Sequence, residues 1–331
     1  MPLAMNPSEN ITEIAAPAPE IKEYDELIVN STEHLNELNR EEGWDAEYIQ
    51  MEQSPLEARF QVREYPDILA AKEWYSTRME IRCAPPPGMI ALLVSSPGDR
   101  CMEADGESMG DRAVHVIWPG GLTHFLTFRS DGGHIVHFDA AAFETTYRHL
   151  YPGAAPLPRN SAQIYPCTAE QVQELRICMD ELVLEPSTRF STEERASAIK
   201  SMLLDIVISA DGWPSNGAHV TPATRQHVAL LARDYIESQY HEPVTMELLC
   251  AHTAGSARTL QRAFIEHFEV TPIEYLKLRR LNAAHRDLMQ HHNGGSTIAE
   301  IAMKHGFSHL GRFSRDYRKL FHELPRETLG R

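Results

Sequence analysis

The chain has few features of a secreted, membrane-bound or disulfide-stabilised protein. Its five cysteines, Cys83, Cys101, Cys167, Cys178 and Cys250, include no closely spaced pair. None of its apolar runs approaches the ~20 residues that span a bilayer, and no basic and then apolar segment marks its N-terminus as a secretory signal. We therefore expect a cytoplasmic protein with reduced thiols and without a membrane partner.

Positive charge is also scarce. The 331 residues include 31 Lys and Arg against 47 Asp and Glu, a net charge of −16, which disfavours binding of the whole chain to nucleic acid. The deficit is uneven, however. Residues 225–331 contain 15 Lys and Arg against 12 Asp and Glu, a balance of +3, whereas residues 1–224 carry −19. The two parts of the chain therefore suit different partners.

One pattern occurs twice near the C-terminus, with the copies 53 positions apart. Each copy has an apolar residue, an arginine, an aromatic residue, a phenylalanine and a proline at the same spacing. The copies are Leu260, Arg262, Phe264, Phe268 and Pro272, and Phe313, Arg315, Tyr317, Phe321 and Pro325. The repetition predicts two copies of one structural unit.

Each copy has the pattern of two short helices joined by a turn. The first helix is predicted at Met246–Thr253 and again at 298–305. The second helix places its apolar residues at four-residue spacing on one face, and Ser256 and Ser308 stand where an N-cap is expected. A proline then ends each unit. This arrangement is typical of a helix-turn-helix.

The polar face of the second helix suits a DNA groove. Arg258, Gln261 and Arg262 lie away from the apolar face of the first copy, as Arg312 and Arg315 do in the second. Arginine can bind guanine through two hydrogen bonds, and glutamine can bind adenine in the same way. An ordinary solvated basic face is the alternative for either copy alone, but the duplication favours double-stranded DNA as the partner.

Residues 225–331 resemble the AraC/XylS family of transcription regulators. The second copy matches that family's pattern of Gly-Phe, Phe-x-Arg-x-aromatic and a closing proline, and the segment between the copies matches its joining helix. The matching residues are Gly306, Phe307, Phe313, Arg315, Tyr317 and Pro325, and Tyr275, Leu276, Arg280, Leu281, Ala284, Leu288 and Met289. The resemblance implies an all-α DNA-binding domain with helix-turn-helix units at about 245–268 and 297–321.

Two departures and one narrower likeness accompany this resemblance. Glu269 and His322 stand where the family has glycine after each second helix, so we expect these helix ends to be shaped differently. The segments 242–245, 249–250, 258–261 and 306–313, with 119–121 and Phe125, are similar to the ethanolamine-operon regulators within the family.

The resemblance also implies which residues contact DNA. One chain would read two successive major grooves with its two recognition helices, about 34 Å apart. The residues implied as base contacts are Arg258, Gln261, Arg262, Arg312, Ser314 and Arg315, and those implied as phosphate contacts are Thr259, His309 and Lys304. Because Arg262 and Arg315 recur in both copies, a role in the fold or at a phosphate stays open for them.

The N-terminal half has a different pattern. Residues 1–20 are predicted to form a disordered tail and residues 21–39 an acidic helix. Short apolar runs separated by Pro and Gly turns then predict strands that form a small barrel or sandwich, at 60–62, 79–81, 90–94, 113–118, 125–128 and 134–138. We expect a β-rich regulatory domain at 21–150, with an effector chamber lined by aromatic residues or, alternatively, those residues in its core. They are Trp74, Tyr75, Trp118, Phe125 and Phe128.

Helices return at 168–184 and 192–209, each with a broad apolar stripe that is typical of core packing. The resemblance adds dimerisation as a second role for this segment, 151–210. The Gly and Pro residues of 211–224 predict a linker before the DNA-binding domain at 225–331.

No group of residues suggests catalysis. His115, His124, His134 and His137 lie in or beside expected strands, but they lack the His-x-His and downstream Glu of metal-binding cupins. We therefore expect no enzyme activity, no metal and no cofactor, and a metal-dependent barrel enzyme fused to a DNA-binding domain is the least favoured alternative.

These observations together predict a multidomain α+β protein, with a β-rich barrel-like sensing domain and an all-α domain of two helix-turn-helix units. We expect a bacterial, nucleoid-associated transcription regulator that binds promoter DNA, acts with RNA polymerase, forms a homodimer and responds to a small-molecule effector. Control of the N-terminal domain by a protein partner is the main alternative.

Overall fold

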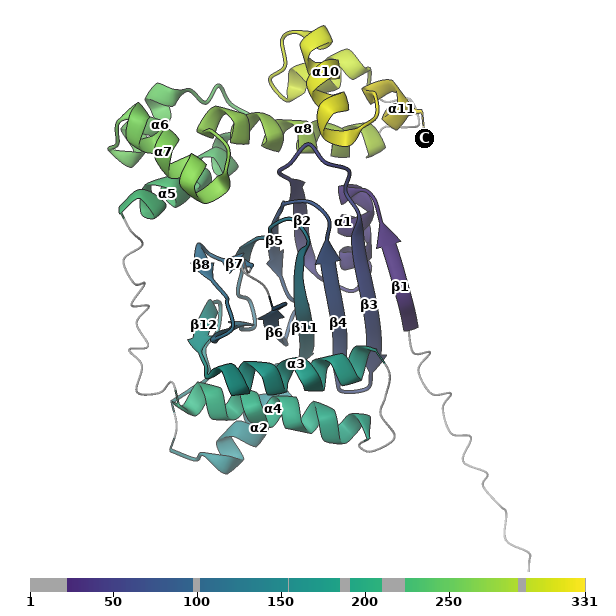
Figure 1. Ribbon diagram of the computed structural model, residues 1–331, viewed down its shortest axis with the longest axis vertical. Helices are drawn as coiled ribbons and strands as arrows, with labels where there is room; N and C mark the ends of the chain where they lie inside the picture. Colours follow the sequence, from purple (N-terminus) through teal and green to yellow (C-terminus); the bar gives the residue numbers. More distant parts are fainter. Residues whose placement is uncertain are drawn as a thin grey trace, which may run out of the picture.

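The computed structural model describes residues 23–97, 102–153, 155–184, 191–209, 224–290 and 296–330. A β-rich N-terminal part lies below an all-helical C-terminal part in Figure 1, which confirms the predicted α+β class. The predicted tail at 1–20, and the predicted linker at 211–224 apart from Thr224, lie outside the described residues.

The larger sheet has seven strands, each antiparallel to its neighbours, in the order β1-β3-β4-β11-β6-β9-β12. They are β1 (Glu23–Val29), β3 (Ala58–Tyr65), β4 (Ile68–Tyr75), β6 (Met89–Ser95), β9 (Ala113–Ile117), β11 (Asp131–Asp139) and β12 (Ala162–Pro166). One face of this sheet packs against helices and the other against the smaller sheet.

The smaller sheet has five strands in the order β2-β5-β10-β7-β8. They are β2 (Asp45–Gln50), β5 (Met79–Ala84), β7 (Glu103–Ala104), β8 (Glu107–Ser108) and β10 (Thr123–Leu126). Successive side chains of a strand point to opposite faces, so Tyr48 and Ile81 pack toward the larger sheet while Ile49 and Leu126 pack against the C-terminal helices. This sheet is therefore covered on both faces.

The helices of the N-terminal part are α1 (Thr32–Glu41), α2 (Ala140–Leu150), α3 (Ala169–Val183) and α4 (Thr192–Ser209). α3 lies across the lower end of the larger sheet in Figure 1, with α4 and α2 below it. The predicted helices at 168–184 and 192–209 are confirmed, and their apolar stripes are core, with Val172, Leu175, Ile199 and Leu203 fully buried. A dimer contact on these helices stays a prediction.

The prediction of one acidic helix over 21–39 is wrong. The described part of this segment starts as strand β1, which pairs with β3, and the helix begins only at Thr32. Ser31 is its N-cap, because its hydroxyl accepts a hydrogen bond from the His34 amide at 3.2 Å. Pairing with a neighbouring strand has therefore overridden the helical pattern of residues 23–29.

The C-terminal helices are α5 (Thr224–Gln239), α6 (Met246–Thr253), α7 (Ala257–Phe268), α8 (Pro272–Gln290), α9 (Ile298–Lys304), α10 (Leu310–Phe321) and α11 (Pro325–Leu329). α6 and α7 form one helix-turn-helix and α9 and α10 the other, and α8 joins them as predicted (Figure 1). Leu260, Phe264, Phe313 and Tyr317 are fully buried, so the repeated apolar pattern is the core of each unit. Among the described helices, none is long and apolar enough to cross a membrane.

Both recognition helices end in the same way, although each lacks the expected glycine. Glu269 and His322, the C-caps of α7 and α10, have φ values of 57° and 59°, in the left-handed region. The expectation of differently shaped helix ends is therefore wrong: the chain keeps the left-handed ending and accepts its strain. Ser256 caps α7 as predicted, but the N-cap of α10 is His309 and not Ser308.

Replacement of His322 by glycine should raise the free energy of unfolding by about 1 kcal/mol, because glycine adopts φ > 0 without a Cβ clash. Glu269→Gly should gain less. It removes an ion pair of 2.7 Å between Glu269 and the buried guanidinium of Arg78, which belongs to the other domain. Urea unfolding of both variants measures the difference. Equal gains would show that the Arg78 ion pair contributes nothing to stability.

Candidate nucleic-acid interface and its contact with the N-terminal domain

The first recognition helix, α7, presents its predicted DNA-contacting residues to solvent. Arg258, Thr259, Gln261 and Arg262 are all exposed. The Ser256 hydroxyl accepts a hydrogen bond from the Thr259 amide at 3.2 Å, so the start of the helix is fixed. The Arg262 guanidinium lies 3.6 Å from Glu266 and is 64% exposed. Exposed pairs of this kind contribute about 0–1 kcal/mol, so DNA phosphates or bases compete easily for this arginine.

The second recognition helix, α10, repeats this arrangement. Arg312 and Arg315 are exposed, as is the N-cap His309, whereas Ser314 is half-buried. Arg312 is 76% exposed and lies 3.8 Å from Asp316, its partner one turn along the helix. The predicted phosphate contact Lys304 instead pairs with Asp287 of α8 at 2.6 Å. Ser314 is thus the least exposed residue of the second helix-turn-helix set, whereas Lys304 is 60% exposed but already pairs within the domain.

The joining helix α8 sets the distance between the two recognition helices. They lie toward its opposite ends (Figure 1), where Tyr275 packs against Phe264 and Phe268, and His285 contacts Tyr317. A helix of 19 residues is about 28 Å long. This length is close to the ~34 Å that separates successive major grooves on one face of DNA.

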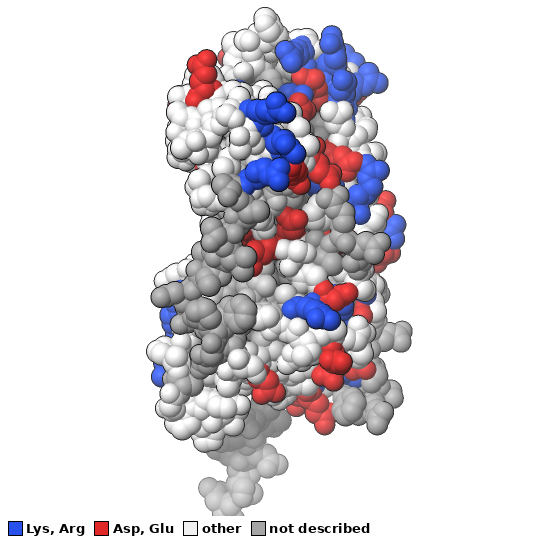
Figure 2. Space-filling model, turned by 60° about the vertical axis from the view of Figure 1, so that its left-hand side comes forward, with Lys and Arg blue, Asp and Glu red and all other residues white. Residues whose placement is uncertain are grey.

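Charge is distributed in agreement with this geometry. On the face shown in Figure 2, Lys and Arg gather mainly over the C-terminal helices in the upper half, while acidic residues are more frequent among the charged residues below. The sequence has the same asymmetry, since residues 1–224 carry −19 and residues 225–331 carry +3. The C-terminal helices are therefore the surface of this chain best suited to DNA.

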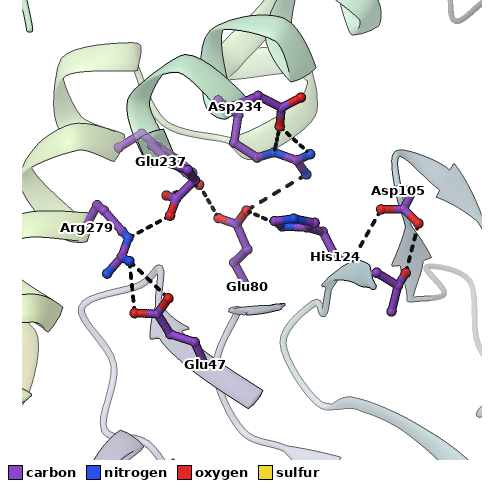
Figure 3. A network of polar contacts seen from close by, with 10 residues as sticks. Glu47, Glu80, Asp105, His124, Asp234, Glu237 and Arg279 are labelled. Carbon is purple, nitrogen blue, oxygen red and sulfur yellow. Dashed lines mark hydrogen bonds and ion pairs between the residues drawn. The ribbon is translucent and has the colours of Figure 1, made fainter. Parts of the chain in front are cut away.

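A network of charged residues joins α8 and α5 to the smaller sheet (Figure 3). The guanidinium of Arg279, which is almost fully buried, lies 2.7 Å from Glu237 of α5 and 2.9 Å from Glu47 of β2. Arg286, about two turns farther along α8, binds the same Glu47 carboxylate. These two arginines hold the pKa of Glu47 below its usual range against the opposing effect of burial.

Three further contacts tie the same helix to the N-terminal domain. The Asn282 amide accepts from the Gln50 amide at 3.0 Å and donates to the Gln50 carbonyl at 3.1 Å, as a neighbouring strand would. His285 lies 2.7 Å from Glu33 of α1. The N-terminal domain therefore holds α8, the element that sets the spacing of the recognition helices, and leaves Arg258 and Arg312 exposed.

Glu80 is the buried centre of this network. The Tyr275 hydroxyl lies 2.5 Å from Glu80 and 3.0 Å from Glu237. The tyrosine hydroxyl has one proton and can donate only one of these two hydrogen bonds. The other hydrogen bond must therefore be donated by a protonated carboxyl group, of Glu80 or of Glu237. Burial raises the pKa of Glu80, with Arg233 opposing the rise and Glu237 adding to it. We therefore assign the proton to Glu80.

The contact between the domains should weaken as pH rises through the raised pKa of Glu80. A carboxyl whose folded pKa exceeds its ordinary 4.5 stabilises the folded state below 4.5, and this contribution is lost as pH increases through the folded value. Each unit of the rise corresponds to about 1.4 kcal/mol. Urea unfolding of the wild type, measured at pH values from about 5 to 8, should show this decrease in the free energy of unfolding. The free energy of unfolding of Glu80→Gln should depend less on pH.

The neighbouring histidine does not account for this pH dependence. Burial lowers the pKa of His124 to about 4, so this histidine stays neutral over the same range. The remaining facing groups are Glu47, Arg233, Glu237, Tyr275 and Arg279. If Glu80→Gln keeps the full pH dependence of the wild type, the proton belongs to another of these groups.

The opposite face of the smaller sheet borders a cavity of about 70 Å³. Of the five aromatic residues predicted to line a chamber, only Phe125 lies in its wall. The wall consists of Leu27, Leu38, Asn39, Glu42, Trp44, Tyr48, Phe60, Val62, Leu69, Ala71, Glu73, Ile81, Cys83, Leu93, Phe125 and Ile135. The cavity therefore lies between the two sheets and beside α1.

The other four aromatic residues lie elsewhere. Trp118 is fully buried on the helix side of the larger sheet, where its indole donates to the Tyr165 hydroxyl at 3.2 Å. Tyr75 is fully buried beneath the cavity wall, and Phe128 packs into the core shared with the C-terminal helices. Trp74 is half-buried under the Arg59 guanidinium, 5.4 Å from its ring.

The four histidines of the expected strands point to separate partners. His115 packs edge-on to Phe125, His124 faces Glu80, His134 lies 2.9 Å from Asp180, and His137 lies beside Trp44. Burial lowers the pKa of His115 to about 3 and that of His137 to about 4. Within the ranges that the structure describes, no group of three or more His, Cys, Asp or Glu is placed to hold a metal ion.

Sequence reasoning missed the residues that couple the domains. Glu47 and Arg279 are 232 positions apart, and neither belongs to a recognisable motif. Arg279 does occupy the predicted joining helix beside the motif residue Arg280, but the two differ in role: Arg280 donates to the carbonyls of Tyr240 and Glu242 in its own domain. Only the fold distinguishes them.

Comparison with known proteins gives a family match within the C-terminal part and sequence similarity to transcription regulators. A family described as "Helix-turn-helix domain" matches residues 249–331. A probable thc operon regulatory protein of Rhodococcus erythropolis is 33% identical over 102 residues, 31% of this chain and 31% of that protein. The XylDLEGF operon transcriptional activator 2 of Pseudomonas putida is 35% identical over 95 residues, 29% of this chain and 60% of that protein. The chain thus spans less than two thirds of either relative.

Among solved structures, a probable AraC family transcriptional regulator from Rhodopseudomonas palustris CGA009 is 37% identical. The match covers 31% of this chain and 94% of that one, with a TM-score of 0.30. The family match at 249–331 runs from within α6 to α11 and so includes both recognition helices. The C-terminal part of the chain is therefore a helix-turn-helix domain of the AraC/XylS type.

Proposed function

We propose that the chain is a transcription regulator that reads two successive major grooves of promoter DNA and is controlled by a small molecule bound in its N-terminal domain. The observation that carries the first part is the pair of exposed basic helices, α7 and α10, fixed toward opposite ends of one helix of about 28 Å. We assign base contacts to Arg258, Gln261, Arg262, Arg312 and Arg315, with Thr259, His309 and Ser314 beside them.

The position of the smaller sheet supports control by the N-terminal domain. On β2, Tyr48 lines the cavity while Glu47 binds Arg279 of α8. On β5, Ile81 lines the cavity while Glu80 meets Tyr275. A ligand that moves the inner face of these strands therefore shifts the outer face that holds α8. Its effect is limited to its preference between the two arrangements.

We further propose that the regulator acts on RNA polymerase as a homodimer, in the cytoplasm and on the nucleoid. A domain whose balance is only +3 binds DNA weakly by charge alone, so doubling the site favours specific binding. The narrower likeness to ethanolamine-operon regulators stays a prediction.

Selection of bound fragments from the source genome, with the full-length chain at a stated salt concentration, tests this function. We expect an enriched motif with two half-sites about one turn of DNA apart. The matched control is the Arg258→Ala/Arg312→Ala variant, which should enrich the motif much more weakly and with relaxed preference in both half-sites. If both proteins enrich the same motif with the same base preferences, Arg258 and Arg312 do not read the bases.

A further inference from the structure

We propose that the cavity between the two sheets binds a small apolar amine, held as a cation by Glu73 and surrounded by aromatic rings. This proposal rests on the proposed control by a small molecule and names the class of that molecule. It is carried by the composition of the cavity wall, by the position of Glu73 and by the size of the space.

The wall is apolar and aromatic, with acidic groups and no basic ones. Its rings belong to Trp44, Tyr48, Phe60 and Phe125. Among the described residues that line it there is no lysine, arginine or histidine, so nothing in the wall would neutralise a bound anion. Aromatic faces attract ammonium groups through the negative charge of the ring face. A cation with an apolar body fits this wall better than a carboxylate does.

Glu73 supplies the opposite charge from the larger sheet. Leu69 and Ala71 of the same strand β4 line the cavity, and Glu73 continues this alternate row. Tyr75 donates a hydrogen bond to one of its carboxylate oxygens, Oε2, at 2.9 Å. Asn39 in turn donates to the hydroxyl of Tyr48 at 3.0 Å, which leaves the Tyr48 proton for Tyr75 or a ligand.

The charge of Glu73 favours a ligand group that donates a hydrogen bond over one that accepts a hydrogen bond. Burial raises the pKa of Glu73 to about 7, the Tyr75 hydrogen bond lowers it, and Asp131 adds a small rise. An ammonium beside the carboxylate stabilises its ionised form, whereas a second carboxylate there would repel it. A neutral alcohol could share one hydrogen bond but would leave the charge of this half-buried carboxylate without a counter-ion.

The volume limits the size of the amine. The cavity of about 70 Å³ is roughly half of the ~150 Å³ that holds benzene in a protein. A branched or linear amine of about four carbons is therefore the largest that fits without repacking of the wall. The inner face of β5 and β10, with Ile81, Cys83 and Phe125, would contact its apolar part, which connects the site to the face that holds α8.

The test compares n-butylamine, n-butanol and butyrate, molecules of one size and three charges, by NMR titration of the full-length chain. We expect the amine to bind at least ~10-fold more tightly than the other two. Glu73→Gln should lower amine affinity by at least ~10-fold, and Ala71→Leu should abolish binding by filling the space. Glu37→Gln, an exposed residue of α1, removes the same charge away from the cavity and should bind amine like the wild type.

Thermal unfolding of each variant without ligand establishes that it is folded. Equal affinity for butylamine and butanol, tighter binding of butyrate, or unchanged amine binding in Glu73→Gln would each overturn the proposal. A different ligand that stabilises the chain and changes its DNA affinity would overturn the amine class but leave the proposed function standing. Amine binding without any change in DNA affinity would support the site and overturn its control of α8.

Discussion

Replacement of Arg279 by methionine should release α8 from the N-terminal domain and cost about 3–5 kcal/mol, among the largest losses expected for one substitution in this chain. The side chain is nearly fully buried and bridges Glu47 and Glu237, at 2.9 and 2.7 Å. Methionine keeps much of its length but leaves two partly buried carboxylates without their shared cation. Urea unfolding measures the loss, and hydrogen exchange at the Gln50 amide, which donates to Asn282, reports on the interface itself.

Lys277→Met is the matched control, because it removes a positive charge from the same helix. Lys277 pairs with Glu274 at 2.8 Å within α8 and approaches Asp316 of α10, both in its own domain. Its loss should cost less than ~1 kcal/mol and leave the Gln50 amide protected. If the two variants lose the same stability, or if Gln50 stays protected in Arg279→Met, the arginine does not hold the domains together.

Arg279 also separates coupling from DNA binding. The described contacts of its side chain are with Glu47, Glu237 and the ring of Tyr240, 4.1 Å from its guanidinium, and none is on a recognition face. A change in DNA affinity caused by this variant would therefore arise from the freed position of α8. A ligand effect on DNA binding that is present in the wild type and absent in Arg279→Met would show that control passes through this contact.

The C-terminal domain was predictable because its pattern is local and duplicated. Phe264 and Phe313 belong to helices in which four-residue spacing alone selects the buried face. The chain carries the same helix-turn-helix pattern twice there, and a chance occurrence of the pattern would not be repeated at the same spacing. The left-handed ends at Glu269 and His322 were beyond prediction, since the preference for glycine is an energetic tendency that neighbouring structure overrides.

The β-rich domain was only partly predictable, because two of its layers are covered on both sides. Strand β4 alternates between Ala70, which faces the helices, and Ala71, which faces the cavity. Neither face is polar throughout, so the period of two that marks a half-exposed strand is absent. The same ambiguity scattered the predicted aromatic residues: size suggested Trp118 and Phe125 equally, but only the fold shows that they lie in different layers.

The shared sheet explains why no single motif announces the coupling. Tyr48 and Glu47 are neighbours in sequence, yet one lines the cavity and the other binds α8. Alternation along a strand makes such a pair inevitable wherever a sheet is buried on both faces. The cavity side of this sheet could move without the side that holds α8 only if each strand twisted independently of its neighbours. The hydrogen-bonded pairing of β2 with β5 opposes such independent twisting.

Alanine at both Arg258 and Arg312 should weaken specific DNA binding by about 2–6 kcal/mol, because each bidentate arginine contact contributes about 1–3 kcal/mol of discrimination. The two residues lie on separate helices at opposite ends of α8, so their effects should add. Each single variant should relax sequence preference in one half-site and leave the other intact. Binding to a set of sites with every base varied in turn, at one salt concentration, measures both effects.

Arg326→Ala is the control for charge, since Arg326 is exposed on α11 and outside both recognition helices. It should lower affinity for every sequence by the same small factor and leave the preferences unchanged. Arg258→Ala behaving like this control would make Arg258 a phosphate contact. Gln261→Ala then shows whether α7 reads bases at all. A loss of adenine preference in this variant would mean that α7 lies in the groove and reads bases through residues other than Arg258. An equal loss of affinity for every sequence would mean that α7 does not contact the bases.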